Sequence, residues 1–209
     1  GVKSARILYL YPSTTKNSLI EKIACSKEFH TYYDRPLQHI SSKVLKIMKR
    51  GKGADQLKDL MQHMKLQENS FVRSTFIVGH PGETQEDFEE LCNYLKEYRF
   101  DRVNVFSYSD EDGTGAYDFK DKVEQELIDK RAEILGDIIS EVTLSKLEEE
   151  IGKTVELVVD GESSEHEYLL SARKLSWAPD IDGEIYINDN ELNGEIKTGI
   201  IYQAKITEL

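Results

Sequence analysis

Hydrophobic and polar positions follow two different periods along the first two-thirds of the chain. Short runs of β-branched and aromatic residues predict strands at residues 7–11, 31–33, 71–78 and 102–106. Apolar residues at helical spacing predict helices at residues 18–25, 43–49, 54–65 and 86–98. Strands that alternate with helices in this way form a parallel sheet with right-handed crossovers. We therefore expect an α/β fold over this part of the chain.

The strand at residues 71–78 runs directly into a glycine-proline turn at residues 79–82. Thr84 is the expected N-cap of the next helix, and Asp87 takes the reciprocal position of a capping box. In α/β folds, ligands bind beyond the carboxyl ends of the strands. The loop at residues 79–83 is therefore a candidate ligand site.

The pattern changes after residue 120. Residues 121–151 predict one long, charged helix whose apolar stripe consists of Val123, Leu127, Ile134, Ile138, Val142 and Leu147. Short β-type segments follow at residues 155–159, 168–172, 184–187 and 199–206, separated by the turn signals Asp160-Gly161, Asp182-Gly183 and Asn193-Gly194. We expect two domains, an α/β unit with its closing helix over residues 1–150 and a small antiparallel β-barrel over residues 151–209.

Composition narrows the class of partner. The chain has 39 acidic and 27 basic residues and a net charge of -12, so nucleic acid is a poor default partner, because phosphate binding needs clustered positive charge. Cys25 and Cys92 form neither a metal-binding CxxC pair nor a disulfide framework, and we interpret them as reduced, half-buried thiols. Neither an export signal nor a long apolar run is recognisable. We expect a soluble, cytoplasmic protein.

A second candidate site follows the strand at residues 31–33. Pro36 ends that strand, so Gln38 and His39 are expected at the same sheet edge as the glycine-proline loop. Taken alone, His39 is better explained as a hydrogen-bonded loop histidine and Gln38 as a solvated side chain. Either Ser41 or Ser42 is a good N-cap for the helix that follows.

Arg73 interrupts an otherwise apolar strand. A guanidinium there needs an anionic partner, because burying it unpaired is costly. A ligand carboxylate and the side chain of Asp34 are equally good candidates. The basic cluster at residues 43–53 is interpreted as a solvated helix face, with an acidic or phosphorylated partner as the alternative. Residues 51–53 lack the strand-before, helix-after context of a phosphate loop.

Five segments together resemble one family, the radical S-adenosylmethionine methylthiotransferases, and most closely the branch that modifies an aspartate of a small-subunit ribosomal protein. The segments are LYLYP at 8–12, YDRPLQHIS at 33–41, FIVGHPGET at 76–84, FSYS at 106–109 through Gly113-Thr114, and APDIDG at 178–183. The resemblance covers essentially the whole chain. It implies part of a (β/α) radical SAM barrel, strands three to six, followed by a TRAM β-barrel.

The same resemblance implies S-adenosylmethionine and 4Fe-4S clusters as cofactors. The family's cluster-binding CxxxCxxC motif is missing from this chain, which we interpret as a truncated form that is inactive alone. The resemblance places Gln38, Arg73, Val78, Gly79 and Phe106 around the S-adenosylmethionine pocket. Arg73 would pair with the methionyl carboxylate, Gln38 would approach the ribose, and the backbone at residues 78–79 would let the adenine come close.

Charge favours a protein substrate. Residues 151–209 contain five basic and twelve acidic residues, a net charge of -7, and an acidic barrel attracts basic partners such as ribosomal proteins. We expect a basic small-subunit ribosomal protein to dock there, with Trp177, Asp180 and Asp182 as candidate contacts and neither membrane nor direct nucleic-acid binding. Core packing explains the lone tryptophan equally well.

Two alternative functions stay open. The chain is interpreted either as a fragment of a tRNA adenosine methylthiotransferase or as a non-catalytic module that only docks a basic ribosomal protein through its TRAM barrel. The second alternative predicts binding without affinity for S-adenosylmethionine. In each case the apolar strand at residues 7–11 is an exposed sheet edge, which predicts self-association.

Overall fold

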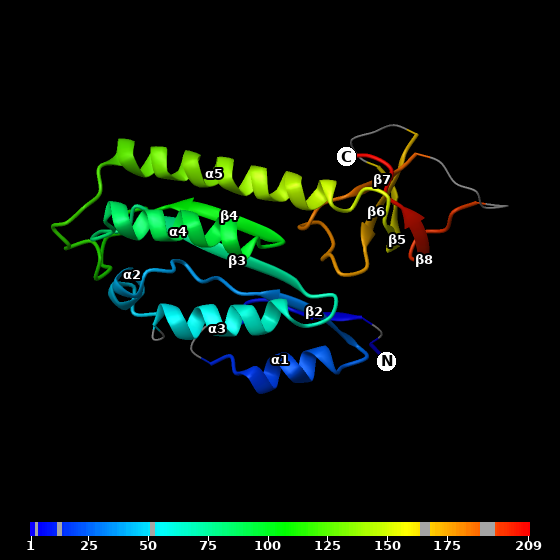
Figure 1. The fold of residues 1–209 in the computed structure, drawn as a ribbon, viewed down its shortest axis with the longest axis horizontal. Helices are drawn as coiled ribbons and strands as arrows, with labels where there is room; N and C mark the ends of the chain where they lie inside the picture. The colour runs from blue at the N-terminus through cyan, green and yellow to red at the C-terminus, as the bar shows by residue number, and fades with distance from the viewer. Residues whose placement is uncertain (3, 12–13, 51–52, 164–167, 189–194) are drawn as a thin grey trace. The chain divides into compact units, whose positions relative to one another are not determined.

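The computed structural model describes all residues except 3, 12–13, 51–52, 164–167 and 189–194 (Figure 1). Pro12, the glycine-lysine pair at 51–52 and the turn signal Asn193-Gly194 therefore lie outside the described residues. The chain divides into two compact units, Gly1–Leu144 and Ser145–Leu209. This division falls inside the last helix, slightly before the predicted boundary at residues 150–151.

The first unit alternates strands with helices, as the sequence predicts (Figure 1). Its elements are β1 (Ala5–Ile7), α1 (Asn17–Ala24), β2 (Phe29–Asp34), α2 (Ser42–Ile47), α3 (Ala54–Lys65), β3 (Phe71–Val78), α4 (Gln85–Tyr98), β4 (Arg102–Ser107) and most of α5 (Gln125–Glu148). The four strands pair in parallel in the order β1-β2-β3-β4. The bounds of α3 and β3 match their predictions.

The two faces of this sheet differ in burial. On β3, Val72, Phe76 and Val78 belong to the hydrophobic core. Between them, Arg73, Thr75 and Ile77 point to the other face and are only partly covered. The strand register places Asp34 beside Arg73 and Phe106 beside Ile77 on that face. We call this second surface the open face and define it by Asp34, Arg73, Thr75, Ile77, Asn104 and Phe106.

The prediction of a strand at residues 7–11 is wrong for residues 8–11. β1 ends at Ile7, and Tyr9 has a left-handed backbone with φ 60°. The Tyr9 N–H donates to the Asp34 side chain over 3.3 Å, and the Leu10 N–H donates to the Asp34 carbonyl over 2.8 Å. A left-handed residue breaks the regular ladder, which an apolar run in the sequence cannot reveal.

The apolar stripe predicted for the long helix is correct only in part. Ile138 is buried, and Ile134 and Val142 are partly buried against the core. Leu127 and Leu147 are exposed, and Val123 precedes the helix. The buried positions are Ile128, Arg131, Leu135 and Ile138. A buried arginine in the middle of this face shifted the apparent pattern, because a hydrophobic period treats every arginine as a surface position.

The second unit is a four-stranded antiparallel sheet in the order β7-β6-β5-β8. Its strands are β5 (Thr154–Glu162), β6 (Leu170–Lys174), β7 (Ile185–Ile187) and β8 (Ile201–Lys205). The turn predicted at Asp160-Gly161 is wrong. β5 continues through it with a register shift next to Gly161, whose φ is 147°, so the glycine forms a β-bulge.

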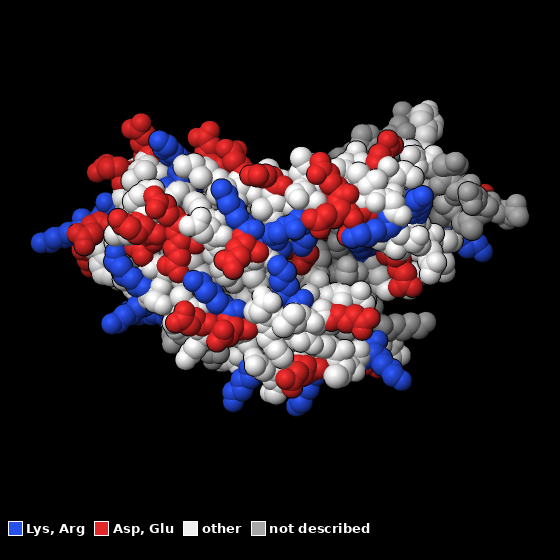
Figure 2. Space-filling view, viewed as in Figure 1, with Lys and Arg blue, Asp and Glu red and all other residues white. Residues whose placement is uncertain are grey.

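Across the described part of the chain, no helix has the length and apolar character that a bilayer-spanning segment needs. On the visible side of the molecule, acidic and basic side chains are interspersed (Figure 2). The surplus of acidic residues therefore does not form one continuous patch on this side.

Candidate functional site

The loop at residues 79–83 is fixed by hydrogen bonds on each side. The Gly79 N–H donates to Glu83 Oε2 over 2.9 Å, and the Glu83 N–H donates to the His80 carbonyl over 2.9 Å. At the other end, the Gly82 N–H donates to the Asp121 carbonyl over 2.8 Å. The carboxyl end of β3 therefore leads into a rigid loop.

Gly79 is required by both backbone conformation and space. Its φ is +80°, and a Cβ built on it would lie 2.3 Å from Cγ1 of Ile128. The side chain of Ile128 on α5 thus fills the space that a residue with a Cβ would need. The backbone at residues 78–79 was expected to allow a ligand to come close. On the side that faces α5, the missing side chain of Gly79 instead lets Ile128 pack against the backbone.

Beneath the loop lies a buried charged network that the sequence analysis did not find. Glu83 Oε1 accepts from Arg131 Nη1 over 2.7 Å, and both side chains are almost completely buried. His39 Nε2 lies 3.7 Å from Glu83 Oε2, also without solvent contact. Burial lowers the pKa of His39 to about 4, and burial raises the pKa of Glu83 despite the nearby guanidinium. His39 is therefore a neutral, buried histidine at neutral pH.

Asp87 joins the starts of α2 and α4 near this network. It accepts from the Ser41 hydroxyl over 2.5 Å, from the Thr84 N–H and hydroxyl over 2.9 Å each, and from Lys43 Nζ over 3.2 Å. Burial alone would raise its pKa, but these donors outweigh burial and lower it to about 2. The capping box of Thr84 and Asp87 is confirmed.

The alternative between the two serines resolves into two different roles. Ser41 is the N-cap of α2, where its hydroxyl accepts from the Val44 N–H. The Ser42 hydroxyl accepts instead from the Ala54 N–H over 2.9 Å, at the first residue of α3. His39 Nδ1 accepts from the Ser41 N–H over 2.9 Å, so the histidine is hydrogen-bonded within its own loop.

On the open face, the structure supplies one of the two partners considered for Arg73. Arg73 Nε lies 3.9 Å from Asp34 Oδ1, and both side chains keep some solvent contact. Gln38 lies further along, with φ 72°, and its backbone bonds to Thr75 and Ile77 on β3 over 2.8 Å each. Phe106 is 59% exposed beside Ile77. Gln38 and Phe106 therefore flank the end of β3, whereas Arg73 lies nearer its start.

The candidate contacts in the second unit differ in exposure. Asp180 is exposed, and Trp177 is half-buried with Lys174 Nζ 5.7 Å from its ring centre. Asp182 is completely buried, and its Oδ2 accepts from the Ala178 N–H over 2.8 Å. Its carboxylate therefore holds the loop before β7, and a surface contact is not available to it.

The cysteines occupy separate elements. Cys25 follows α1 and is exposed, which corrects the expectation of a half-buried thiol, whereas Cys92 on α4 is partly buried. Among the described residues, no three His, Cys, Asp or Glu side chains lie close enough together to bind a metal ion. The two cysteines of the chain therefore do not supply the several thiolates together that an iron-sulfur cluster needs.

Comparison with known proteins identifies relatives for the whole chain. Residues 151–209 match the family model of the TRAM domain. The chain is 69% identical to the ribosomal protein uS12 methylthiotransferase RimO of Aliarcobacter butzleri, 56% identical to that of Sulfurimonas denitrificans, and 47% identical to that of Campylobacter jejuni RM1221. Each match covers 100% of this chain and 47 or 48% of the relative. The chain thus spans about half the length of these relatives.

A solved structure shares the fold. Coproporphyrinogen III oxidase (HemN) from Escherichia coli, described as a radical SAM enzyme, matches with a TM-score of 0.52 and 18% identity. The match covers 68% of this chain and 32% of the HemN chain. It confirms the predicted parallel α/β architecture, and the TRAM match agrees with the antiparallel sheet.

Proposed function

We propose, on the premise that this chain belongs to the RimO family of methylthiotransferases, that its first unit forms one wall of an S-adenosylmethionine pocket. The enzyme would transfer a methylthio group to the β-carbon of an aspartate in ribosomal protein uS12. The observation that carries the proposal is the 69% identity, over the full length of this chain, to the ribosomal protein uS12 methylthiotransferase RimO of Aliarcobacter butzleri. As a modifier of ribosomes, the protein would work in the cytoplasm.

The open face has the chemistry that S-adenosylmethionine needs. Its methionyl carboxylate would pair with Arg73, its ribose would lie near Gln38, and its adenine would pack on Ile77 and Phe106. Arg73 precedes Ile77 by four positions, or about 13 Å along a strand. The ligand would therefore bind in an extended conformation along β3, with the loop that begins at Gly79 beyond its adenine end.

Two features of the site would set the strength of this binding. Asp34 competes with the ligand carboxylate, because it already lies 3.9 Å from Arg73 Nε. The buried pair of Glu83 and Arg131 keeps the loop at the end of β3 in place, so little ordering is left for the ligand to impose. Together these contacts favour a preformed site of moderate affinity.

The cluster has no ligand set among the residues that the structure describes. In the proposed enzyme, thiolates outside these 209 residues would hold a 4Fe-4S cluster. Bound S-adenosylmethionine would supply the radical and methyl chemistry. The role of this chain is to bind and orient that molecule through Arg73, Gln38 and Phe106.

The substrate protein would dock on the second unit. Residues 151–209 carry a net charge of -7, which attracts a basic protein and repels the phosphates of tRNA. Trp177 and Asp180 keep enough exposure to contact such a partner. The same charge argues against the alternative of a tRNA substrate.

Calorimetric titration of the chain with S-adenosylmethionine and with its decarboxylated analogue tests the pocket. Arg73→Met should weaken S-adenosylmethionine binding about tenfold, as expected for one charge-assisted hydrogen bond, and leave binding of the analogue unchanged. Asp34→Asn should strengthen S-adenosylmethionine binding by releasing Arg73. Lys46→Met, on the exposed side of α2, is the matched control. Equal losses for both ligands would reject the assignment of Arg73, and absence of binding would favour a pure docking module.

A further inference from the structure

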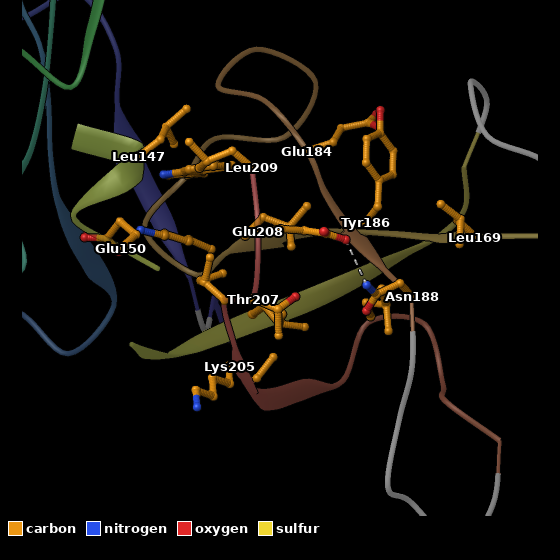
Figure 3. Close-up of a pocket in the computed structure, with 17 residues that line it drawn as sticks. Leu147, Glu150, Leu169, Glu184, Tyr186, Asn188, Lys205, Thr207, Glu208 and Leu209 are labelled. Atoms are coloured by element: carbon orange, nitrogen blue, oxygen red, sulfur yellow. Dashed lines mark hydrogen bonds and ion pairs between the residues drawn. The ribbon is translucent and has the colours of Figure 1, made fainter. Parts of the chain in front are cut away.

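The second unit contains a groove between its two outer strands (Figure 3). β7 and β8 stand at opposite ends of the sheet order, so each has one edge without a strand partner among the described residues. The groove lies between β7 and the residues that follow β8, and its volume is about 430 Å³. A hydrogen bond of 3.4 Å from Asn188 Nδ2 to Glu208 Oε1 crosses it (Figure 3).

The groove is lined mainly by apolar side chains. They come from the end of α5, from the small core of this unit and from its last residues, and include Leu147, Leu157, Ile185, Ile187, Ala204 and Leu209. A volume of this size is in the range of sites that bind small ligands or a few side chains. The groove therefore offers apolar surface to an incoming side chain.

Glutamates outnumber lysines among the charged residues of the lining that form no ion pair within the described part of the chain. Glu150 and Lys174 form an ion pair with each other, which leaves Glu184, Glu208 and Lys205 as the remaining charged residues of the lining. Glu184 and Glu208 are exposed. Glu184 precedes β7 on one wall, whereas Glu208 follows β8 on the other wall and reaches Asn188 (Figure 3). A cationic side chain entering between these walls would meet carboxylates from both sides, and the net charge of -7 over residues 151–209 would attract it.

We propose that this groove receives an extended segment of a basic protein. One apolar side chain of the segment packs on the floor, and a lysine or arginine beside it lies against Glu184 and Glu208. The edges of β7 and β8 that lack a strand partner within the described residues offer main-chain hydrogen bonds to an extended chain, which is the geometry of strand addition. The inference rests on the proposed function, because the segment in the groove belongs to the ribosomal protein substrate. RNA would gain nothing from an apolar floor with an acidic rim.

Trp177 makes the test specific. It is the single tryptophan of the chain and it lines the groove, so its fluorescence reports on this site. The intact chain is titrated with tryptophan-free peptides that together span ribosomal protein uS12, while Trp177 emission and peptide anisotropy are recorded. The test variant is Glu184→Lys with Glu208→Lys. Its matched control is Glu156→Lys with Glu162→Lys, which makes the same charge change at exposed positions of β5 outside the groove lining.

One peptide should bind and shift Trp177 emission. The rim variant should weaken that binding at least about tenfold, since each tenfold corresponds to about 1.4 kcal/mol, and the control should weaken it less than about threefold. Circular dichroism verifies that both variants stay folded. Equal losses of peptide affinity in the two variants, or binding without a change in Trp177 emission, would show that the peptide does not bind in the groove. Docking by overall charge would then remain. No binding by any peptide or by intact uS12 would overturn both the groove and the docking of the substrate protein on the second unit, whereas the S-adenosylmethionine pocket is tested separately by its own titration. Tighter binding of an RNA oligonucleotide would reject a protein segment as the occupant of the groove.

Discussion

Glu83 and Arg131 form a buried ion pair, with Oε1 and Nη1 2.7 Å apart. The pair joins the loop at the end of β3 to α5, and the guanidinium also lies over the ring of Phe88 at 5.2 Å from its centre. A second carboxylate oxygen of Glu83 accepts from the Gly79 N–H. One carboxylate thus fixes both the shape of the loop and the position of the helix that covers it.

Removing one partner of this pair should strongly destabilise the first unit. Arg131→Met leaves the Glu83 carboxylate buried and uncompensated, and we expect a loss of about 3–5 kcal/mol in the free energy of unfolding. Urea denaturation followed by circular dichroism measures it. Lys58→Met removes an exposed pair with Glu90 of similar length, 2.9 Å, and should cost no more than about 1 kcal/mol. Similar losses in both variants would contradict the importance given to burial.

His39 should make the stability of the protein fall as the pH is lowered below neutrality. Burial lowers its folded pKa to about 4, whereas the unfolded value is about 6.5. Between these values the unfolded state binds a proton that the folded state excludes, so stability is complete above about pH 6.5 and falls toward pH 4, by about 3 kcal/mol in all. The groups that face His39 are Glu83, Asp87, His80 and Arg131.

The variant His39→Asn isolates this effect. Asparagine keeps an acceptor for the Ser41 N–H but does not titrate. Urea midpoints at pH 7 and pH 5 should differ less in the variant than in the parent chain. This interval avoids Asp87, whose contribution is lost below about pH 4. Glu83, whose pKa is raised, opposes the effect of His39, but it is present in both proteins, so the comparison of variant with parent isolates His39. An unchanged pH dependence in the variant would show that His39 does not control it.

Gly79 and Gly113 provide a matched test of space against backbone strain. Their φ angles are nearly equal, +80° and +78°, but a Cβ at Gly79 would meet Ile128 at 2.3 Å, whereas none of the described atoms lies within 4 Å of a Cβ at Gly113. Gly113→Ala should therefore cost about 1–2 kcal/mol from the left-handed conformation alone. Gly79→Ala should cost distinctly more in thermal or urea unfolding. Equal costs would mean that α5 yields easily at Ile128.

The local signals in the sequence predicted the elements of the first unit well. β3, α3 and the capping box of Thr84 and Asp87 depend on neighbouring residues, and each was found from spacing alone. The alternation of strands with helices then fixed the parallel sheet. The local signals failed where a single residue adopts an unusual backbone conformation. Tyr9 ends the strand predicted at residues 7–11, and a β-bulge beside Gly161 replaces the turn predicted at residues 160–161.

The candidate site was only partly predictable, because its buried charges depend on contacts far apart in the sequence. Arg35 is an example: it is completely buried, burial lowers its pKa to about 10, and the phenols of Tyr94 and Tyr98 lie near it. Nothing in its neighbourhood along the chain indicates this. Two signals for the pair of Glu83 and Arg131 were present in the sequence. Glu83 lies in the predicted loop, and Arg131 occupies a position where the helical period of α5 calls for an apolar residue.

The edge at β1 should make the chain self-associate through exposed aromatic and aliphatic residues. Leu8, Tyr9 and Tyr11 follow this edge strand and are 47, 79 and 52% exposed. Burying such residues between two chains stabilises a dimer by about 25 cal/mol per Å² of apolar surface. Sedimentation of the chain over a range of concentrations should therefore show association.

Two tyrosines allow this expectation to be tested with a matched control. Tyr9 and Tyr168 are both strongly exposed, 79 and 92%, and both have left-handed backbones, but Tyr168 belongs to the second unit, where it precedes β6. Tyr9→Lys should weaken association at least about tenfold, because the charge must be desolvated when the edge is covered, and a tenfold change corresponds to about 1.4 kcal/mol. Tyr168→Lys adds the same charge and should leave association nearly unchanged. A chain that stays monomeric at every concentration would contradict the prediction, and equal effects of both variants would assign the association to net charge.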